Sequence, residues 1–380
     1  MQAAPPDPLT IQSIRAHPIR ASLPAVQHTS QGAWPSLEIV VVAIETESGL
    51  TGLGECLARR GAAAYARFIE TTLAPRILGR SAHDRRALFT AMRETLSGRP
   101  GGMLLESIAG IDIAFWDLAA QAAGQPLWRL LGGVGRRRIA AYASSINWTD
   151  PEIAAGELAA ARAQGFREIK IKLGRPVVRA VEQARAMRAA AGDEIALSAD
   201  ANCAFDADDA LRVGRVLSDL DYAWFEEPVP PDDHAAYARL RQHLPIRLAA
   251  GEGEFLARAA APLIEAGLIG LVQPDVARAG GISETWRIAE LAAVHGVAYA
   301  PHVGWSGAVC AMASLHLAAA AESFRTFECM VFPNPLRQEI ARPTPWEKAL
   351  LEDGALAVPD APGLGLTLDP DAIARFTIRE

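Results

Sequence analysis

The chain has 380 residues, half of them hydrophobic, and a formal charge of −7 at pH 7. This length can bury a large core and suggests two or three domains, and a mild acidic balance without a basic stripe argues against a nucleic-acid partner. No apolar stretch reaches the roughly 20 residues of a membrane span, and the segment Met1–Pro8 lacks the regions of a signal peptide. Because the four cysteines show no CxxC spacing, we expect reduced thiols in a cytoplasmic protein.

Residues 1–135 predict an α+β domain. The β-type segments Ile11–Arg20 and Leu37–Glu45 flank a turn-rich loop from Pro24 to Pro35, and a further strand runs toward Cys56. Apolar residues at helical spacing follow in three segments, Ala63–Leu73, Asp84–Leu96 and Leu104–Gly124. Strands followed by helices indicate an α+β unit.

Residues 136–342 predict strict alternation of strands and helices. The first strand is expected at Ile139–Ala143, and the helices at Pro151–Gln164, Val177–Ala191, Ala207–Leu217, Asp232–Gln242, Phe255–Ala266, Ser283–His295 and Gly307–Ala321. This alternation is typical of a parallel β/α barrel. Beyond Arg342 the alternation stops, and we expect residues 343–380 to return to the N-terminal unit.

Seven acidic or basic side chains recur along the predicted barrel at intervals of about 23 to 28 residues, each closing a short β-like run. They are Lys172, Asp200, Glu226, Glu252, Asp275, His302 and Glu328. The interval matches one strand, one helix and two loops. Parallel barrel strands end on one face, where active sites lie, so the spacing predicts one catalytic ring.

Three members of this ring predict a metal site. Asp200, Glu226 and Glu252 end three consecutive strands, and three anions that converge in a dry barrel mouth repel one another unless a cation neutralises them. An all-oxygen set fits a hard divalent ion such as Mg²⁺, with Mn²⁺ as a substitute, better than zinc. The alternative is a set of unrelated surface acids or helix N-caps, which three carboxylates in register make less favoured.

Two lysines predict a base. Lys170 and Lys172 lie two apart on one strand and therefore share a face. Neighbouring ammonium groups beside a bound cation lower each other's pKa, which makes a lysine a usable base near neutral pH. The alternative is a pair of solvated lysines on an edge, but Ile169 and Ile171 favour a barrel strand that directs both lysines inward.

A second acid/base group is expected on the other side of the ring. Asp275 and His302 end adjacent strands, and a carboxylate beside an imidazole fixes its tautomer and raises its basicity. A lone His or Asp is usually structural, so this pair gains its meaning from the register. Glu328 closes the last strand, where a partly desolvated and protonated carboxyl could donate a hydrogen bond to a developing anion.

These residues stand in motifs that resemble the enolase superfamily, specifically its mandelate racemase branch: Lys170-Ile-Lys172, Asp200-Ala-Asn202, Glu226-Glu-Pro228, Gly251-Glu252, Gln273-Pro-Asp275 with Gly280-Gly281, Pro301-His302 and Glu328, with Gly110-Ile-Asp-Ile-Ala-Phe-Trp-Asp117 in the N-terminal unit. The resemblance implies a modified TIM (β/α)7β barrel with an α+β capping domain built from the N-terminal part and the C-terminal tail. It also implies Mg²⁺ ligands at Asp200, Glu226 and Glu252, a base at Lys172, and a second base at His302 with Asp275. Glu328 would contact the substrate carboxylate. Asp275 stands where the muconate-lactonising branch has a lysine, which argues against that branch.

The ring predicts removal of the proton α to a carboxylate, in an enolate mechanism that Mg²⁺, Lys170 and Glu328 would stabilise. The segments Phe332–Gln338 and Pro362–Gly365 look most like the relatives that act on acid sugars, so we expect an acid-sugar dehydratase or aldarolactone cycloisomerase. A racemase or epimerase of a 2-hydroxy acid uses the same ring and stays the first alternative. A non-catalytic barrel that only binds a ligand is the distant alternative, because every metal ligand and both bases are present.

Substrate selection is expected from the cap and from residues beside the ring. The loop from Pro24 to Pro35 and the segment Gly54–Gly61 should form two lids. The candidate substrate contacts are Asn202, His28, Trp34, Trp305 and Asn147, and for the two tryptophans ordinary packing is an equal alternative. The expected partner is a small carboxylate substrate, without nucleic acid or membrane, and the expected assembly is a homo-oligomer.

Overall fold

The computed structural model describes residues 7–98, 100–133, 135–344, 351–352 and 354–379. Its N-terminal part is an antiparallel sheet in the order β1-β2-β3, with bounds Ile11–Thr29, Gly32–Thr46 and Thr51–Cys56. The helices of this part are α1 Ala62–Phe68, α2 Arg85–Arg93 and α3 Gly102–Ala122, with a π turn at Ile69–Leu73 and 3-10 turns at Ala74–Arg76 and Ala82–Asp84.

Helix α3 lies directly on this sheet because glycines face each other. A Cβ atom on Gly54 of β3 would stand 1.7 Å from the carbonyl oxygen of Gly110 in α3. A Cβ on Gly110 would stand 2.7 Å from Cys56 Sγ. The pair therefore lets the backbone of the helix approach the strand more closely than any side chain would permit.

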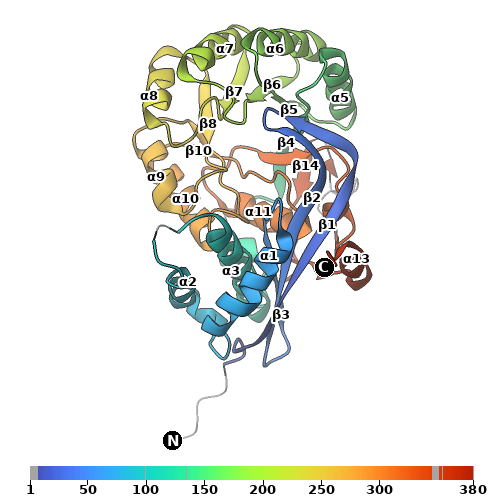
Figure 1. The fold of residues 1–380 in the computed structure, drawn as a ribbon, viewed down its shortest axis with the longest axis vertical. Coiled ribbons are helices and arrows are strands. Elements are labelled where there is room, and N and C mark those ends of the chain that lie inside the picture. Colours follow the sequence, from blue (N-terminus) through green and yellow to red (C-terminus); the bar gives the residue numbers. More distant parts are fainter. Residues whose placement is uncertain (1–6, 99, 134, 345–350, 353, 380) are drawn as a thin grey trace, which may run out of the picture.

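The prediction of a loop from Pro24 to Pro35 is wrong, because most of this segment belongs to two paired strands. Strands β1 and β2 continue as a paired ribbon as far as Thr29 and Gly32, with an irregularity between Ser22 and Gln27 that accommodates the proline. The tip is held by the barrel, where Trp148 N–H donates to the carbonyl of His28 at 3.1 Å. Figure 1 shows this long ribbon reaching from the cap to the barrel.

The barrel confirms the predicted (β/α)7β alternation. Its parallel strands are β4 Arg138–Ile146, β5 Glu168–Lys172, β6 Ala196–Asp200, β7 Tyr222–Glu226, β8 Arg247–Ala250, β9 Leu271–Val272, β10 Ala298–Tyr299 and β11 Phe327–Met330. The helices between them are α5 Pro151–Ala163, α6 Val177–Ala191, α7 Ala207–Asp219, α8 His234–His243, α9 Ala257–Glu265, α10 Gly281–Val294 and α11 Ala308–Ala320. Strand β11 pairs with β4, and a bridge from Tyr299 to Phe324 joins β10 to the β11 side.

Alternation along the strands divides the barrel core in two. Outward side chains such as Ile169 and Ile171 join the large cluster beneath the helices. A separate interior cluster fills the barrel axis and consists of Tyr142, Trp224, Ala249, Leu271 and Ala300. The interior is therefore a packed floor, and the polar strand ends stand on top of it.

The C-terminal tail contacts both units. Strand β14 (Ala355–Ala357) runs antiparallel to β4 and pairs with β13 (Leu351–Glu352), while β12 (Ala341–Arg342) pairs with β15 (Thr367–Leu368). Helix α13 (Pro370–Phe376) lies near β1, and Ile378 N–H donates to the carbonyl of Pro18 at 2.9 Å. The tail thus returns to the N-terminal sheet as expected, while the exact boundaries at residues 135 and 342 stay predictions.

Two short helices, α4 Leu127–Leu130 and α12 Pro335–Gln338, complete the described elements. Among the described residues, no helix combines the length and apolar character needed to cross a membrane.

Candidate active site

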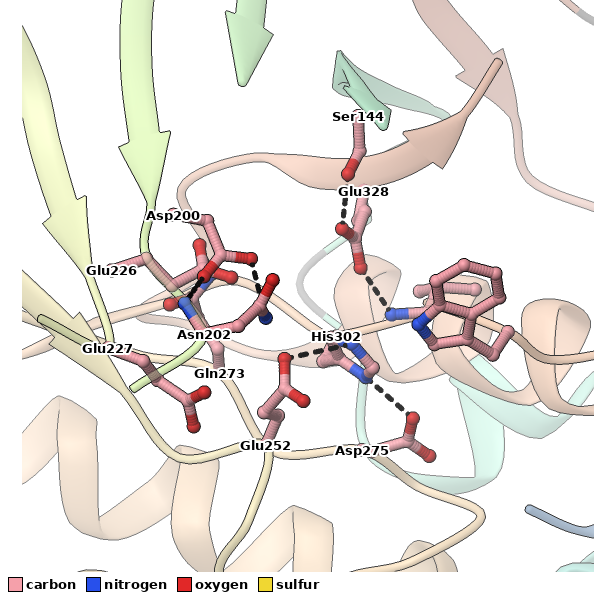
Figure 2. A network of polar contacts seen from close by, with 12 residues as sticks. Ser144, Asp200, Asn202, Glu226, Glu227, Glu252, Gln273, Asp275, His302 and Glu328 are labelled. Carbon is pink, nitrogen blue, oxygen red and sulfur yellow. Dashed lines mark hydrogen bonds and ion pairs between the residues drawn. The ribbon is translucent and has the colours of Figure 1, made fainter. Parts of the chain in front are cut away.

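The polar strand ends meet at one mouth of the barrel because all eight strands are parallel. Lys172, Asp200 and Glu226 are the last residues of β5, β6 and β7. The other members of the ring follow β8, β9 and β10 by a few residues or, in the case of Glu328, lie within β11. Figure 2 shows the side chains of the ring from Asp200 to Glu328 gathered around a common space.

The three carboxylates predicted to bind metal lie together. One oxygen from each of Asp200, Glu226 and Glu252 can be chosen so that all three lie within 4.8 Å of one another. Burial raises the pKa of Glu226 to about 7 despite the opposing charge of Lys170. A hard divalent cation suits this oxygen-only set, because it would restore the charge balance that burial disturbs.

Two further side chains support these carboxylates. Gln273 Nε2 donates to Glu226 at 2.6 Å, and Asn202 donates to Asp200 from its backbone N–H at 2.8 Å and its side-chain amide at 3.1 Å. Asn202 has a φ of 44°, so its backbone turns sharply to make both contacts. Asn202, which was predicted to contact the substrate, therefore contacts Asp200 of the carboxylate cluster directly.

Lys170 is buried within a ring of negative charge. Its ammonium lies 2.6 Å from Glu226 and 3.1 Å from Glu328, over the ring of Tyr142. Burial lowers the pKa of Lys170, but the carboxylates outweigh it and hold that pKa well above its usual value. Lys170 is thus a fixed positive charge facing the mouth.

With the protein groups alone, the pKa of Lys172 lies above its usual value, and the lowering expected beside a bound cation stays a prediction. Burial and the neighbouring Lys170 do lower the pKa of Lys172, but Asp200, which forms an ion pair with it, raises that pKa above the usual value. The strand register places a carboxylate in contact with each lysine, Glu226 with Lys170 and Asp200 with Lys172. With the protein groups alone, Lys172 is an ammonium.

His302 lies between two carboxylates (Figure 2). Its Nδ1 is 2.7 Å from Asp275 Oδ2, and its Nε2 is 3.1 Å from Glu252 Oε2. Burial lowers the pKa of His302, but Glu252 and Glu328 raise it well above the usual value. The predicted pairing of Asp275 with His302 is therefore present, and the imidazole also reaches the carboxylate cluster.

Glu328 is ionised in contrast to the expected protonated form. Ser144 Oγ donates to it at 2.6 Å and Val303 N–H donates at 2.7 Å. Burial raises the pKa of Glu328, but Lys170 and His302 outweigh burial and lower it to about 2. Two hydrogen-bond donors and two positive charges thus surround the Glu328 carboxylate, which can accept hydrogen bonds but not donate one.

The other candidate substrate residues separate into two groups. The rings of Trp34 and Trp305 contact each other at a tilt of 33° with centroids 5.1 Å apart, and Trp305 lies in the loop that follows His302. Asn147 accepts from His28 N–H at 2.6 Å and donates to Glu157 at 2.7 Å, so its amide holds the ribbon tip to the barrel. The exposed side chain of His28 stands at that tip.

The sequence motifs did not single out several side chains near the mouth. Arg59 Nη2 lies 3.3 Å from Glu252 Oε1, and Glu227 is buried beside the same cluster. The only indication of Arg59 in the sequence is that it lies within the segment Gly54–Gly61, which was expected to form the second lid. Ser144 carried no signal, because its strand contributes no charged residue to the ring.

Comparison with known proteins agrees with this arrangement. Residues 11–132 match the family profile "Mandelate racemase / muconate lactonizing enzyme, N-terminal domain", and residues 154–372 match "Enolase C-terminal domain-like". A D-galactarolactone cycloisomerase from Agrobacterium fabrum is 31% identical over 389 residues, which cover 97% of this chain and 99% of the relative. An arabinonate dehydratase from Saccharolobus solfataricus is 33% identical over 337 residues, covering 87% and 88%.

A solved structure extends the likeness to three dimensions. A racemase from Streptomyces coelicolor A3(2) with bound magnesium superposes with a TM-score of 0.89 at 29% identity, covering 97% of this chain and 100% of the other. Sequence profiles, full-length relatives and fold therefore agree. This chain belongs to the enolase superfamily, within its mandelate racemase and muconate lactonizing enzyme family.

Proposed function

We propose that this enzyme uses Mg²⁺ to remove the proton α to the carboxylate of an acid sugar and then eliminates the β-oxygen. The product is a dehydrated keto acid in a dehydratase, or an opened lactone in an aldarolactone cycloisomerase. The observation that carries the proposal is that Lys172 and His302 flank the carboxylate cluster, the first against Asp200 and the second against Glu252. The full-length relatives named as a cycloisomerase and a dehydratase support it.

The difficulty of the reaction explains the density of charge. A proton α to a carboxylate is roughly 20 pKa units less acidic than an ammonium, which makes the transfer about 27 kcal/mol uphill in water. Preorganised charge at the site where the anion develops is the largest available contribution. Lys170 provides such a charge, because three carboxylates hold it protonated at the mouth.

Asp200, Glu226 and Glu252 would hold the Mg²⁺ ion. When bound, this ion supplies positive charge, which neutralises the three carboxylates, lowers the pKa of neighbouring Lys172 and stabilises the negative charge on the substrate carboxylate. Mn²⁺ is a suitable substitute because it accepts the same oxygen ligands.

Lys172 and His302 divide the proton transfers. One of them removes the α-proton, and the conjugate acid of the other protonates the departing oxygen. Asp275 accepts from Nδ1 of His302 and thus presents Nε2 to the substrate. Glu328 keeps Lys170 charged and orients it. The Glu328 carboxylate is itself held in place by the hydrogen bonds that it accepts from Ser144 and Val303.

The mouth suits a substrate with several hydroxyl groups. Within the described part of the chain, the indole Nε1 of Trp34 and the Nε of Arg59 are buried without an acceptor. Such donors gain a hydrogen bond when an oxygen-rich ligand enters, and they favour it over an apolar one. Trp34 and Trp305 would pack against the carbon skeleton of this ligand.

A single screen tests the proposal. Hexonates, hexarates and their lactones are incubated with the Mg²⁺-loaded enzyme in D₂O and followed by ¹H and ²H NMR. Loss of water, or opening of a lactone, with a keto group at the former α-carbon and a solvent deuteron at the former β-carbon, is the expected result. Inversion at the α-carbon with one deuteron and every hydroxyl retained would instead establish a racemase or epimerase, which the same two flanking bases favour. An absence of both product and α-proton exchange with every acid would refute the proposal.

A further inference from the structure

Glu55 is a fully buried carboxylate outside the ring of strand ends. It lies near the end of β3, in the N-terminal unit, yet its hydrogen bonds go to the barrel. Glu55 Oε1 accepts from Gly307 N–H at 2.6 Å, and Oε2 accepts from Cys310 N–H at 3.1 Å. Gly307 is the N-cap of α11 and Cys310 is its third residue, so a carboxylate of one unit caps the N-terminus of a helix of the other.

Gly307 leaves the space that this carboxylate occupies. A Cβ atom on Gly307 would stand 2.9 Å from Glu55 Oε2 and 2.5 Å from Ile39 Cδ1. The φ of Gly307 is −89°, which any residue can adopt. The requirement for glycine is therefore one of room beside Glu55.

Helix α11 directly follows the loop that carries His302. The carbonyls of Val303 and Ser306 accept from Arg337 Nη2 at 3.0 and 3.1 Å, and Val303 N–H is held by Glu328. Glu55 holds the far end of the same loop at Gly307. The backbone that positions the imidazole is thus fixed from both ends.

A second route leads from Glu55 to the partner of His302. Cys310, whose N–H binds Glu55, places its thiol 3.9 Å from Asp275 Oδ1. Leu57, two residues after Glu55, donates its N–H to the carbonyl of Ala277 at 3.3 Å, and Ala277 N–H donates back to Asp275 at 2.8 Å. Both members of the Asp275–His302 pair therefore rest on the segment around Glu55.

We propose that Glu55 is a positioning residue for His302: by capping α11 across the boundary between the units, it sets the orientation of the imidazole toward the substrate. This inference rests on the proposed function of His302 as one of the two bases. It connects the segment Gly54–Gly61, which contains Glu55 and is expected to form the second lid, to the loop that carries His302.

Asp117 provides a matched control. It too is a buried carboxylate of the N-terminal unit that accepts two backbone N–H groups, from Leu53 at 2.8 Å and from Leu364 at 2.7 Å. Neither partner belongs to the loops of Asp275 or His302. Glu55→Gln and Asp117→Asn keep side-chain volume and remove one acceptor each, so both should lower stability.

The deciding measurement is made on folded, Mg²⁺-loaded protein with ¹⁵N-labelled histidine. The resonance of the His302 Nδ1–H, bonded to Asp275, should shift in Glu55→Gln and stay at its wild-type position in Asp117→Asn. With the acid sugar identified by the screen, Glu55→Gln should lose about 10- to 100-fold in kcat, the usual effect of groups that orient a functional side chain. Its ratio of α-proton exchange to product formation should move toward that of His302→Asn, while Asp117→Asn keeps the wild-type ratio.

The outcomes separate the two proposals. An unchanged resonance and an unchanged ratio in folded Glu55→Gln would overturn the positioning role while leaving the proposed function intact. A shifted resonance with neither product formation nor α-proton exchange in any acid would overturn the proposed function instead. If Glu55→Gln does not fold, Glu55→Asp retains the charge, draws the carboxylate back by one methylene and is judged by the same two readouts.

Discussion

His316 should make the stability of this protein depend on pH in a way that one substitution removes. This histidine lies in α11 with its side chain fully buried. Its Nδ1 accepts from Trp128 N–H at 3.2 Å, and its Nε2 lies 3.2 Å from the carbonyl of Leu364, to which it donates. The neutral ring thereby joins the barrel to α4 and to the C-terminal tail.

The expected magnitude follows from the lowered pKa. Burial, opposed by the contact with Leu364, lowers the pKa of His316 to about 4 from an ordinary value of 6.5. Between pH 6.5 and pH 4 the unfolded chain binds a proton at this histidine that the folded chain does not bind. The free energy of unfolding therefore decreases as the pH is lowered from 6.5 to 4. The full effect is about 3 kcal/mol, of which about 2 kcal/mol is lost between pH 7.5 and pH 5.

The assay compares wild type with His316→Gln, which offers a donor and an acceptor but does not titrate. Urea unfolding followed by tryptophan fluorescence gives the free energy of unfolding at pH 7.5, 6 and 5. The variant should be less stable at pH 7.5, and its disadvantage should shrink by about 2 kcal/mol at pH 5. Replacement of the exposed His243 by Gln controls for the removal of a histidine. A difference between wild type and His316→Gln that is the same at pH 7.5 and pH 5 would refute the reasoning.

Three further predictions concern the site and the cap. EDTA should abolish turnover and Mg²⁺ or Mn²⁺ should restore it, whereas Glu226→Gln should bind Mg²⁺ more weakly in calorimetry; normal binding and native turnover in that variant would contradict the ligand assignment. Lys172→Ala and His302→Asn should each lower kcat by at least ~10³, and full turnover in both would end the two-base mechanism. Gly54→Ala should cost about 1–3 kcal/mol in chemical unfolding, because its Cβ would meet the Gly110 carbonyl at 1.7 Å, while Gly156→Ala in α5, with open space around it, should be neutral or stabilising.

The sequence by itself determined the barrel and the members of the candidate site. Amphipathic periodicity placed the helix Val177–Ala191 at the bounds that the structure shows. The regular spacing of Asp200, Glu226 and Glu252 predicted carboxylates that do lie together. Both successes have one cause, since strand and helix periods are local, and parallel connectivity then sends every strand end to the same face.

Tertiary structure alone decided the charge states, the ribbon and the cross-unit contacts. Which carboxylate stands beside Lys172 depends on strand register, which places Asp200 against it, and among the protein groups Asp200 raises the pKa of Lys172. The ribbon tip near His28 is held by residues more than a hundred positions away, which no local pattern encodes. No sequence pattern identified Glu55 and Gly307 for the same reason. Their hydrogen bond spans 252 residues and depends on how the two units pack, which the whole chain determines.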